Sequence, residues 1–254
     1  MKGVVLCGGT GSRLYPLTNI VNKHLLPIYN EPMVHFPLKT LINSGIEDIM
    51  IVAGKGHCGQ FLELLGDGSD FGANLSYMVQ EKPGGIAQAL GLCKRFIGDS
   101  EHIAVILGDN IFQDSFNFDD FCEKDEQARI YLKKVLDPQR FGVVKINNGR
   151  LTEIVEKPKN WHGAFGFAVT GLYLYDYNVF DIIKELKPSD RKELEITDVN
   201  NEYIKRVQLS LDYRIVKGFW SDAGTFESLY KASIFIRENK GEKKENNNTI
   251  IGGK

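Results

Sequence analysis

The sequence predicts an α/β fold, a Rossmann-like three-layer sandwich with a mostly parallel central sheet and an additional smaller β-rich portion. Two observations lead to this prediction. In the first half, short β-branched runs alternate with segments that repeat apolar residues at helical spacing and stop at glycines. From Arg129 onward, the runs become rich in Val, Ile and Tyr, which is typical of further strands. The 254 residues, 43% of them hydrophobic, are enough to bury one large core.

The first half supplies strands and helices in alternation. The expected strands span 4–6, 48–53, 75–80 and 103–109, and the expected helices between them span 33–45, 58–66 and 85–98. This order favours a parallel sheet with helices on both faces, in which ligands bind beyond the carboxyl ends of the strands. The turn after the first strand and Asp109 after the last should therefore lie near each other.

The second half is expected to add strands that are partly antiparallel and enclose one side of the cleft. These strands span 129–137, two runs within 141–158 joined at Asn147-Asn148-Gly149, 167–176 and 211–218. Helices are expected near Tyr177–Leu186 and Glu195–Lys205, then a loop at 220–225 and a last helix from about Phe226. We expect a single domain over 1–238 and a frayed polar tail over 239–254.

Composition excludes several classes of protein. A formal charge of −2 gives no reason to expect nucleic acid or an anionic membrane as a partner. No apolar run approaches the ~18 residues of a membrane span, and the run from Gly3 to Cys7 is too short for a signal peptide, so we expect a cytoplasmic protein. The four cysteines form no CxxC pair, which indicates reduced thiols rather than a zinc knuckle or a disulfide framework.

The opening turn GGTGSR fits neither common phosphate motif. A Walker A loop requires Lys where Arg13 stands, and a dinucleotide fingerprint requires Gly where Leu14 stands. What remains is a strand followed by exposed amides, two hydroxyls and a guanidinium, which together suit an anion. With Lys23 on the same proline-stiffened arm, the pair suits a polyphosphate. The alternative is a tight connector whose Arg and Lys are merely solvated.

Two aspartates follow predicted strands. Asp109 ends a buried strand, and Asp222 lies in the loop SDAGT. Two converging carboxylates could hold Mg²⁺, a hard cation that prefers oxygen ligands. Taken singly, either aspartate is as well explained as a helix N-cap, and a separation of 113 residues does not establish convergence.

Two further motifs could recognise the remaining parts of a ligand. QEKPGGIAQAL places Gln80 at a strand end and Gly85 at a helix start, where an amide and free backbone N–H groups could read a nucleobase edge. VEKP places Glu156 and Lys157 at another strand end, where a carboxylate could bind sugar hydroxyls and an ammonium could bind phosphate. The alternatives are a simple turn with a surface Gln and a solvated strand end.

Taken together, nine motifs resemble the sugar nucleotidyltransferase family, the sugar-nucleotide pyrophosphorylases, in order and spacing over about residues 1–235. These motifs are GGTGSRLYPLT, NKHLLPI, QEKPGGIAQAL, LGDNIF, FGVV, VEKP, AVTGLYLYD, LKPSDRKELEITDVN and WSDAGT. The resemblance is closest to members that join dTTP and α-D-glucose 1-phosphate to give dTDP-glucose and pyrophosphate. It implies an Mg²⁺-dependent in-line attack of the sugar phosphate on the α-phosphorus. It also implies dTDP-rhamnose and polysaccharide biosynthesis as the setting, and a homo-oligomer, a dimer or a tetramer.

The resemblance implies a role for each matching residue. Residues 1–128 would mainly bind the nucleotide, and residues 129–238 the sugar phosphate. Arg13 would clamp the triphosphate and assist pyrophosphate departure, Lys23 would neutralise the α-phosphate region, and Asp109 and Asp222 would hold magnesium. The remaining assignments are nucleotide contacts at Gly8, Gly9, Thr10, Gly11 and Ser12, thymine contacts at Gln80 and Gly85, and glucose-phosphate contacts at Gly142, Glu156, Lys157, Val169 and Arg191.

The sequence also departs from the family pattern. The stretch KPKNWHGAFGF at 157–167 and Phe141, where Tyr is common, predict a different rim for the sugar pocket. Longer members continue into C-terminal helices, so we expect a short form. The alternatives are a UTP-dependent or other NTP-dependent sugar-1-phosphate nucleotidyltransferase and, in a different class, a non-catalytic nucleotide-binding regulatory subunit of the same fold. A dehydrogenase is the weakest alternative, because the glycine fingerprint is incomplete.

Overall fold

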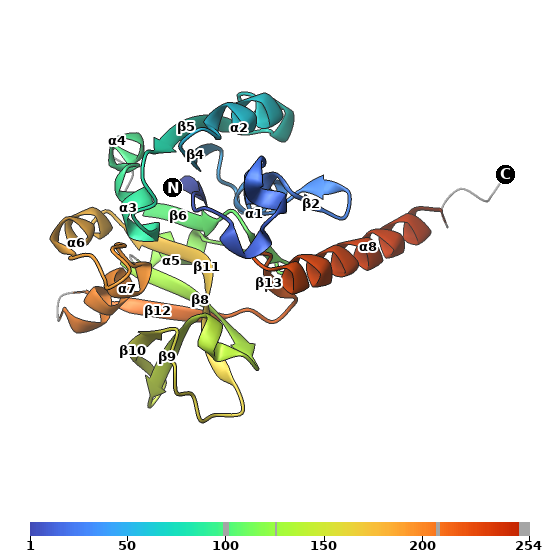
Figure 1. The fold of residues 1–254 in the computed structure, drawn as a ribbon. Coiled ribbons are helices and arrows are strands. Elements are labelled where there is room, and N and C mark those ends of the chain that lie inside the picture. Colours follow the sequence, from blue (N-terminus) through green and yellow to red (C-terminus); the bar gives the residue numbers. More distant parts are fainter. Residues whose placement is uncertain (99–101, 125, 207–208, 249–254) are drawn as a thin grey trace.

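The computed structural model describes residues 1–98, 102–124, 126–206 and 209–248, with 240–248 described by their backbone alone (Figure 1). A nine-stranded sheet forms its centre. Its parallel part has the order β5-β4-β1-β6 and consists of β1 (Lys2–Cys7), β4 (Asp48–Gly54), β5 (Asn74–Gln80) and β6 (His102–Leu107). The chain winds outward from β1 through β4 to β5 and then crosses back to β6. The carboxyl ends of β1 and β6 therefore meet at the point where the strand order reverses, which is where doubly wound sheets bind ligands.

The second half of the chain extends this sheet with strands that are partly antiparallel, as predicted. The long strand β11 (Gly166–Asp176) pairs antiparallel with β6 and with β8 (Ala128–Val135). β12 (Leu211–Ile215) then pairs with β8, and β9 (Gly142–Asn147) pairs with both β11 and β10 (Arg150–Glu156). The expected hairpin joins β9 to β10. Its central residues, Asn148 and Gly149, have φ values of 48° and 74°, as a tight two-residue turn requires.

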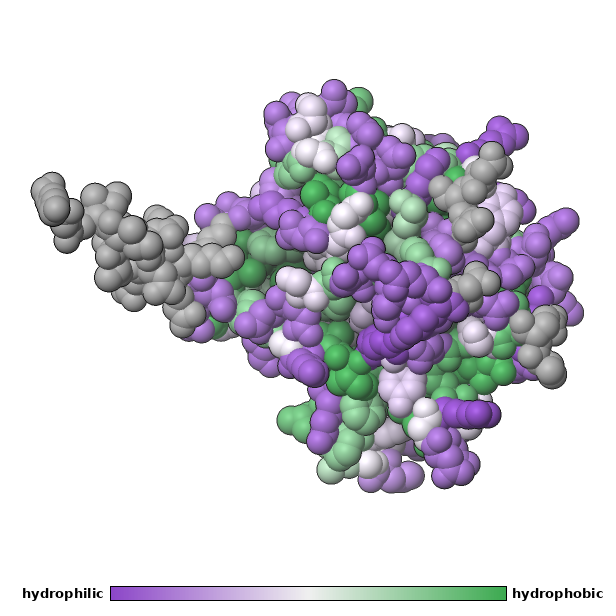
Figure 2. Space-filling model, turned by 180° about the vertical axis from the view of Figure 1, so that it is seen from behind, coloured by the Kyte–Doolittle hydropathy of each residue, from purple (hydrophilic) through white to green (hydrophobic). Residues whose placement is uncertain are grey.

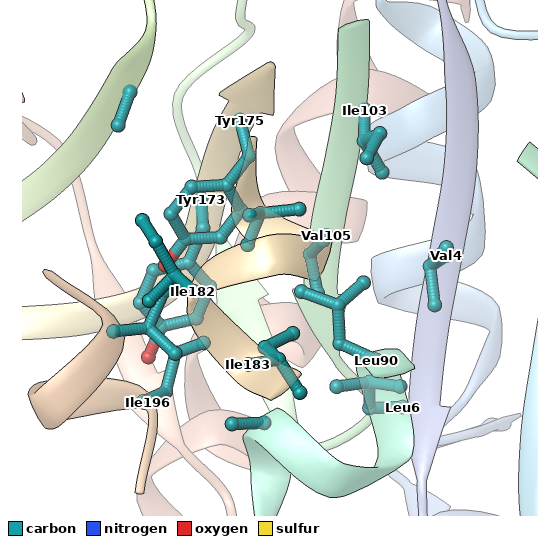
Figure 3. Packing of buried hydrophobic residues seen from close by; sticks show 14 of the residues in the cluster. Val4, Leu6, Leu90, Ile103, Val105, Tyr173, Tyr175, Ile182, Ile183 and Ile196 are labelled. Atoms are coloured by element: carbon teal, nitrogen blue, oxygen red, sulfur yellow. The ribbon is translucent and has the colours of Figure 1, made fainter. Parts of the chain in front are cut away.

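Helices cover both faces of the sheet, which confirms the three-layer prediction. One hydrophobic cluster contains buried residues of α1 (His35–Asn43), α2 (Cys58–Leu65) and α5 (Asp119–Glu123). The cluster on the other face contains buried residues of α3 (Ile86–Gly91), α4 (Lys94–Ile97), α6 (Val179–Glu185) and α7 (Ile196–Lys205). Figure 3 shows the second cluster, where Leu90 and Ile183 lie beside Val105 of β6.

The largest differences from the predicted elements are at three places. The helix expected over 85–98 is two helices, because α3 ends at Gly91 and α4 begins at Lys94. The loop expected at 220–225 begins as a strand, β13 (Trp220–Asp222), which pairs antiparallel with β7 (Asn110–Phe112). The last helix, α8 (Phe226–Asn248), continues into the segment expected to be frayed and points away from the sheet in Figure 1. Its later residues include several Lys and Glu, which are good helix formers, and 249–254 lie outside the described residues.

The remaining elements are short. β2 (Pro27–Ile28) and β3 (Glu31–Pro32) form a small hairpin. Single 3₁₀ turns lie at Ser12–Leu14, Leu17–Asn19, Lys23–Leu25, Ser69–Phe71 and Pro138–Arg140. All four cysteines are free. None of the described helices combines the length and apolar character needed to cross a bilayer. Figure 2 shows hydrophilic residues interspersed with smaller hydrophobic areas on the face opposite Figure 1.

Candidate active site

A cleft of about 310 Å³ lies at the carboxyl ends of β1 and β6. Residues from both halves of the chain line it. The predicted residues in its wall are Gly8, Gly9, Arg13, Lys23, Gln80, Gly85, Asp109, Gly142, Glu156, Lys157, Val169, Arg191 and Asp222. Thr10, Gly11 and Ser12 do not line the cleft. The fold thus brings most of the predicted residues together, but not the later half of the opening turn.

The opening turn directs Arg13 into the cleft. Gly9 and Gly11 have φ values of 92° and 63°, so the chain reverses sharply after β1, and the Thr18 hydroxyl donates to the Gly11 carbonyl oxygen at 2.9 Å. Leu14, fully buried, anchors the 3₁₀ turn that holds Arg13. The guanidinium lies close to Gly224, where an added Cβ would be 2.9 Å from Arg13 Nη2.

Lys23 and Asp109 form an ion pair inside the cleft. The Lys23 Nζ lies 2.5 Å from Asp109 Oδ2, and Asn110 Nδ2 donates to the other carboxylate oxygen at 3.0 Å. Burial by itself would raise the pKa of Asp109, but the charge of Lys23 and these hydrogen bonds lower it well below its usual range. Asp109 is therefore ionised at neutral pH.

The two aspartates converge because strand β13 pairs with strand β7. Asp222 lies opposite Asn110 in this pair, and the Ala223 N–H donates to the Asp109 carbonyl oxygen at 2.8 Å. Burial and then the charge of Asp109 raise the pKa of Asp222, while Arg140 acts in the opposite direction. Asp222 therefore senses the negative charge of Asp109, and a cation near both carboxylates would relieve this repulsion.

Arg140 is a cleft residue that the sequence reasoning missed. Its Nη2 donates to both carboxylate oxygens of Asp222, at 2.8 and 3.0 Å, and its Nη1 donates to Asp137 at 2.9 Å. The signal was an arginine directly before the motif FGVV, in the 3₁₀ turn that leads into β9. The Arg140 guanidinium compensates the charge of Asp222, and Arg13 contributes in the same direction.

Asn110, which also lines the cleft, was likewise given no functional role by the sequence reasoning, although it lies within the motif LGDNIF. Asn110 is buried, and its Oδ1 accepts from the Gly171 N–H at 2.9 Å and from Trp220 Nε1 at 2.7 Å. These bonds leave its Nδ2 to orient Asp109. Asn110 therefore connects β7, β11 and β13 beneath the two carboxylates.

Glu156 organises the other end of the cleft. Its Oε2 accepts from the Thr197 hydroxyl at 2.6 Å, and its Oε1 lies 3.1 Å from Lys157 Nζ and 3.4 Å from Arg191 Nη2. Arg191 also forms a two-point pair with Glu195, at 3.0 and 2.7 Å. Thr197 and Glu195 lie within the motif LEITDVN, but the sequence reasoning gave them no role. Lys157 and Arg191 could bind the phosphate of a sugar phosphate and Glu156 its hydroxyls, while Glu195 compensates part of the charge of Arg191.

Of the residues predicted to alter the rim of the sugar pocket, only some line the cleft. Phe141 lines it and packs against Trp220, with ring centroids 5.2 Å apart. Trp161 does not line it, and its Nε1 donates to the Phe165 carbonyl oxygen at 3.2 Å. The expectation that Trp161 and 165–167 shape the sugar pocket is therefore not supported by this geometry, because the segment folds back on itself outside the cleft.

A sequence model of the nucleotidyl transferase family matches residues 2–239, almost the whole chain. The chain belongs to this family. Glucose-1-phosphate thymidylyltransferase of Neisseria meningitidis is 44% identical over 242 residues, which cover 93% of this chain and 83% of the relative. The enzyme of the same name from Mycobacterium tuberculosis is 39% identical over 241 residues, covering 93% and 82%. These matches confirm the predicted resemblance to the sugar nucleotidyltransferases. Since its relatives are nucleotidyltransferases, this chain is an enzyme of the same family.

Solved structures agree with the fold. A 2.76 Å crystal structure from Bacillus anthracis, described as a glucose-1-phosphate thymidylyltransferase in complex with a sucrose, has a TM-score of 0.87 and 51% identity, covering 93% of this chain and 95% of that one. A UDP-glucose pyrophosphorylase complexed with UDP-glucose has a TM-score of 0.79 at 24% identity, covering 94% and 98%, and shows the shared fold alone.

The nucleotidyl transferase cleft fits a magnesium ion that is only partly held by protein. Within the described ranges, no group of three or more His, Cys, Asp or Glu side chains converges as a metal site. Asp109 and Asp222 nevertheless face the same cleft, and the pKa of Asp222 is raised partly by its neighbour. Mg²⁺ in nucleotide-dependent enzymes is commonly bound by one or two carboxylates together with substrate phosphates. The donor set matches that arrangement.

Proposed function

We propose that this chain transfers the thymidylyl group of dTTP to α-D-glucose 1-phosphate, giving dTDP-glucose and pyrophosphate. One observation supports this most strongly. A single cleft has Arg13 and Lys23 at the end near β1 and Lys157 and Arg191 at the end near β10. Two cationic groups at opposite ends suit two phosphorylated substrates that must meet, and the family relationship supports the same reaction.

The reaction needs no protein nucleophile. A phosphate oxygen of glucose 1-phosphate is already ionised and forms the new bond to the α-phosphorus of dTTP, while the bond from that phosphorus to the pyrophosphate oxygen breaks. The leaving pyrophosphate takes the electron pair. The main obstacle is repulsion between two anions, so positioning and cations are what the protein must supply.

Each cation then has a role. Arg13 would bind the β- and γ-phosphates and stabilise the charge that develops on pyrophosphate, and Lys23 would neutralise the α-phosphate where the second anion approaches. Lys157 and Arg191, held by Glu156, would bind the phosphate of the sugar. Lys23 now pairs with Asp109, so substrate phosphates would take over this ammonium when they enter.

Asp109 and Asp222 would hold the magnesium ion. When bound, it would neutralise phosphate charge and polarise the α-phosphorus. The two aspartates supply negative charge for this ion without a third carboxylate. Magnesium dependence, assembly into a dimer or tetramer, and a cytoplasmic location stay predictions.

The decisive experiment measures pyrophosphate release with dTTP, UTP, CTP, ATP and GTP, each combined with several hexose 1-phosphates. The expected result is the highest kcat/KM with dTTP and glucose 1-phosphate. A preference for UTP would establish the uridylyl alternative instead. Absence of turnover with every pair, in protein that still binds nucleotide, would favour the non-catalytic regulatory subunit.

A further inference from the structure

The side-chain amide of Gln80 is bound on one side by two acceptors. Gln80 ends β5 and is only 5% exposed. Its Nε2 donates to Gln88 Oε1 at 2.6 Å and to the Gly85 carbonyl oxygen at 3.2 Å. Both N–H bonds of the amide are therefore used inside the protein.

The Gly85 carbonyl determines which end of the amide faces it. A backbone carbonyl can only accept a hydrogen bond, so the nitrogen of Gln80, not its oxygen, must lie on this side. Gln88 Oε1, at the shorter distance, reinforces the same orientation. Gln88 itself packs against Gly84, where an added Cβ would lie 3.1 to 3.3 Å from its side-chain atoms, and it does not line the cleft.

The oxygen of Gln80 points toward Gly8. A Cβ added to Gly8 would lie only 2.2 Å from Gln80 Oε1, so glycine at this position leaves room for the oxygen. Gly8 and Gln80 both line the cleft. Within the described part of the chain, no protein donor forms a hydrogen bond with Gln80 Oε1. The atom is also not one of the fully buried polar atoms that have no partner, so it is accessible from the cleft. The cleft thus presents an acceptor that a ligand can use.

We propose that Gln88, together with the Gly85 carbonyl oxygen, is a specificity-determining positioning residue that holds Gln80 as a hydrogen-bond acceptor for the nucleobase. The proposal rests on the proposed function, because it concerns the nucleotide of the same cleft. Thymine and uracil carry a donor, N3–H, on the edge that such an acceptor reads. Cytosine carries a lone pair at the same ring position, so two acceptors would face each other. A locked amide cannot turn to relieve this repulsion, whereas a free amide could present its nitrogen.

The orientation explains discrimination that Gln80 alone would not provide. A glutamine that is free to rotate by 180° can serve either a donor or an acceptor. A site whose polar atoms are fixed rejects a mismatched ligand much more strongly, because the mismatch leaves buried polar atoms unpaired. The lock therefore separates thymine and uracil from cytosine, but it does not separate thymine from uracil.

The test compares three variants of Gln88 in the full chain. Gln88→Met keeps the length and removes the acceptor, Gln88→Lys replaces the acceptor by a donor, and Gln88→Glu keeps an acceptor. We would measure dissociation constants for dTTP, UTP and dCTP by calorimetry and kcat/KM for the same nucleotides by pyrophosphate release. Urea unfolding would confirm that each variant is folded.

Wild type is expected to favour dTTP over dCTP by at least ~100-fold. Gln88→Met should reduce this ratio about 10-fold or more, Gln88→Lys should reduce it further, and Gln88→Glu should keep it within about 3-fold. The ratio of dTTP to UTP should not change, because neither amide contacts the 5-methyl group in this scheme. If either Gln88→Met or Gln88→Lys does not fold, the other of these two variants provides the comparison with wild type.

An unchanged ratio of dTTP to dCTP in folded Gln88→Met or Gln88→Lys would overturn the proposal. An equal fall in the dTTP-to-dCTP ratio and in the dTTP-to-UTP ratio would also overturn it, since that would indicate a general loosening of the cleft. The measured dissociation constants test this inference independently of the proposed reaction. Selective binding of dTTP without pyrophosphate release would refute the proposed function alone, whereas a wild type that binds dTTP and dCTP equally would refute the lock.

Discussion

Asp222 and Arg140 form a two-point ion pair in the cleft, with Nη2 of the arginine 2.8 and 3.0 Å from the two carboxylate oxygens. The same carboxylate lies close enough to Asp109 for the negative charge of that residue to raise its pKa. Asp222 thus has a hydrogen-bonded cationic partner in Arg140, a second cation nearby in Arg13 and an anionic neighbour in Asp109. This balance suits a residue that exchanges an arginine for a metal ion.

We expect Asp109→Asn and Asp222→Asn each to lower Mg²⁺-dependent pyrophosphate release by about 100-fold or more, because an amide lacks the charge that binds the cation. Assays over a range of Mg²⁺ concentrations would check this. Asp181→Asn is the control, since its carboxylate is exposed on α6 and lies 3.7 Å from Lys94. Turnover near that of wild type in either cleft variant would contradict the metal assignment.

Arg140→Gln should lower the free energy of unfolding by about 1 kcal/mol when Mg²⁺ is absent, because Asp222 loses two charge-assisted hydrogen bonds. Added Mg²⁺ should stabilise this variant more than wild type, since no guanidinium then competes for the carboxylate. Urea unfolding with and without Mg²⁺ measures both effects. Arg150→Gln, at an exposed position, provides the control. Equal stabilisation of Arg140→Gln and wild type by Mg²⁺ would show that the arginine does not compete.

His24 should make stability depend on pH. Burial, and then the charge of Lys23, lower its pKa from 6.5 to about 3, so the folded protein keeps it neutral. The unfolded chain binds a proton near pH 6.5, and stability is therefore lost as the pH falls below 6.5 toward 3. This group alone contributes about 1.4 kcal/mol per pH unit in that window.

His24→Gln should therefore reduce the loss of stability between pH 6.5 and 4.5, measured by urea unfolding at a series of pH values. His162→Gln, which alters an exposed histidine, should leave the slope unchanged. If His24→Gln has the slope of wild type, then His24 takes up its proton in the folded state as well.

Gly85→Ala should destabilise the protein more than Gly72→Ala. Both glycines have positive φ, 97° and 74°. Alanine in the left-handed conformation of Gly72 costs about 1–2 kcal/mol, and Gly85, with ψ of 170°, lies in a nearly glycine-only region where the strain is about 1–3 kcal/mol. Only at Gly85 would the new Cβ also meet backbone, 2.4 Å from the Leu194 carbonyl oxygen, whereas nothing lies within 4 Å at Gly72. The clash should cost about 1–3 kcal/mol more. Urea unfolding measures the difference, and equal losses would mean that the backbone near Leu194 yields easily.

The sequence by itself determined the elements and most of the residues of the cleft. Alternation of β-branched runs with helical periodicity is local, so it could be read within short windows, and the strand order of a doubly wound sheet places residues after β1 and β6 together. Gly8, Arg13 and Asp109 could therefore be predicted as neighbours.

Only the tertiary structure decided which distant side chains meet. Asp222 approaches Asp109 because β13 pairs with β7, and no local pattern specifies the register between strands so far apart in the chain. The sequence also did not indicate which residues of a loop line the cleft: Arg140 does, whereas Thr10, Gly11 and Ser12 do not. Helices and strands follow from local periodicity. Contacts between distant residues depend on how these elements pack, and the spacing of residues along the chain does not reveal that packing.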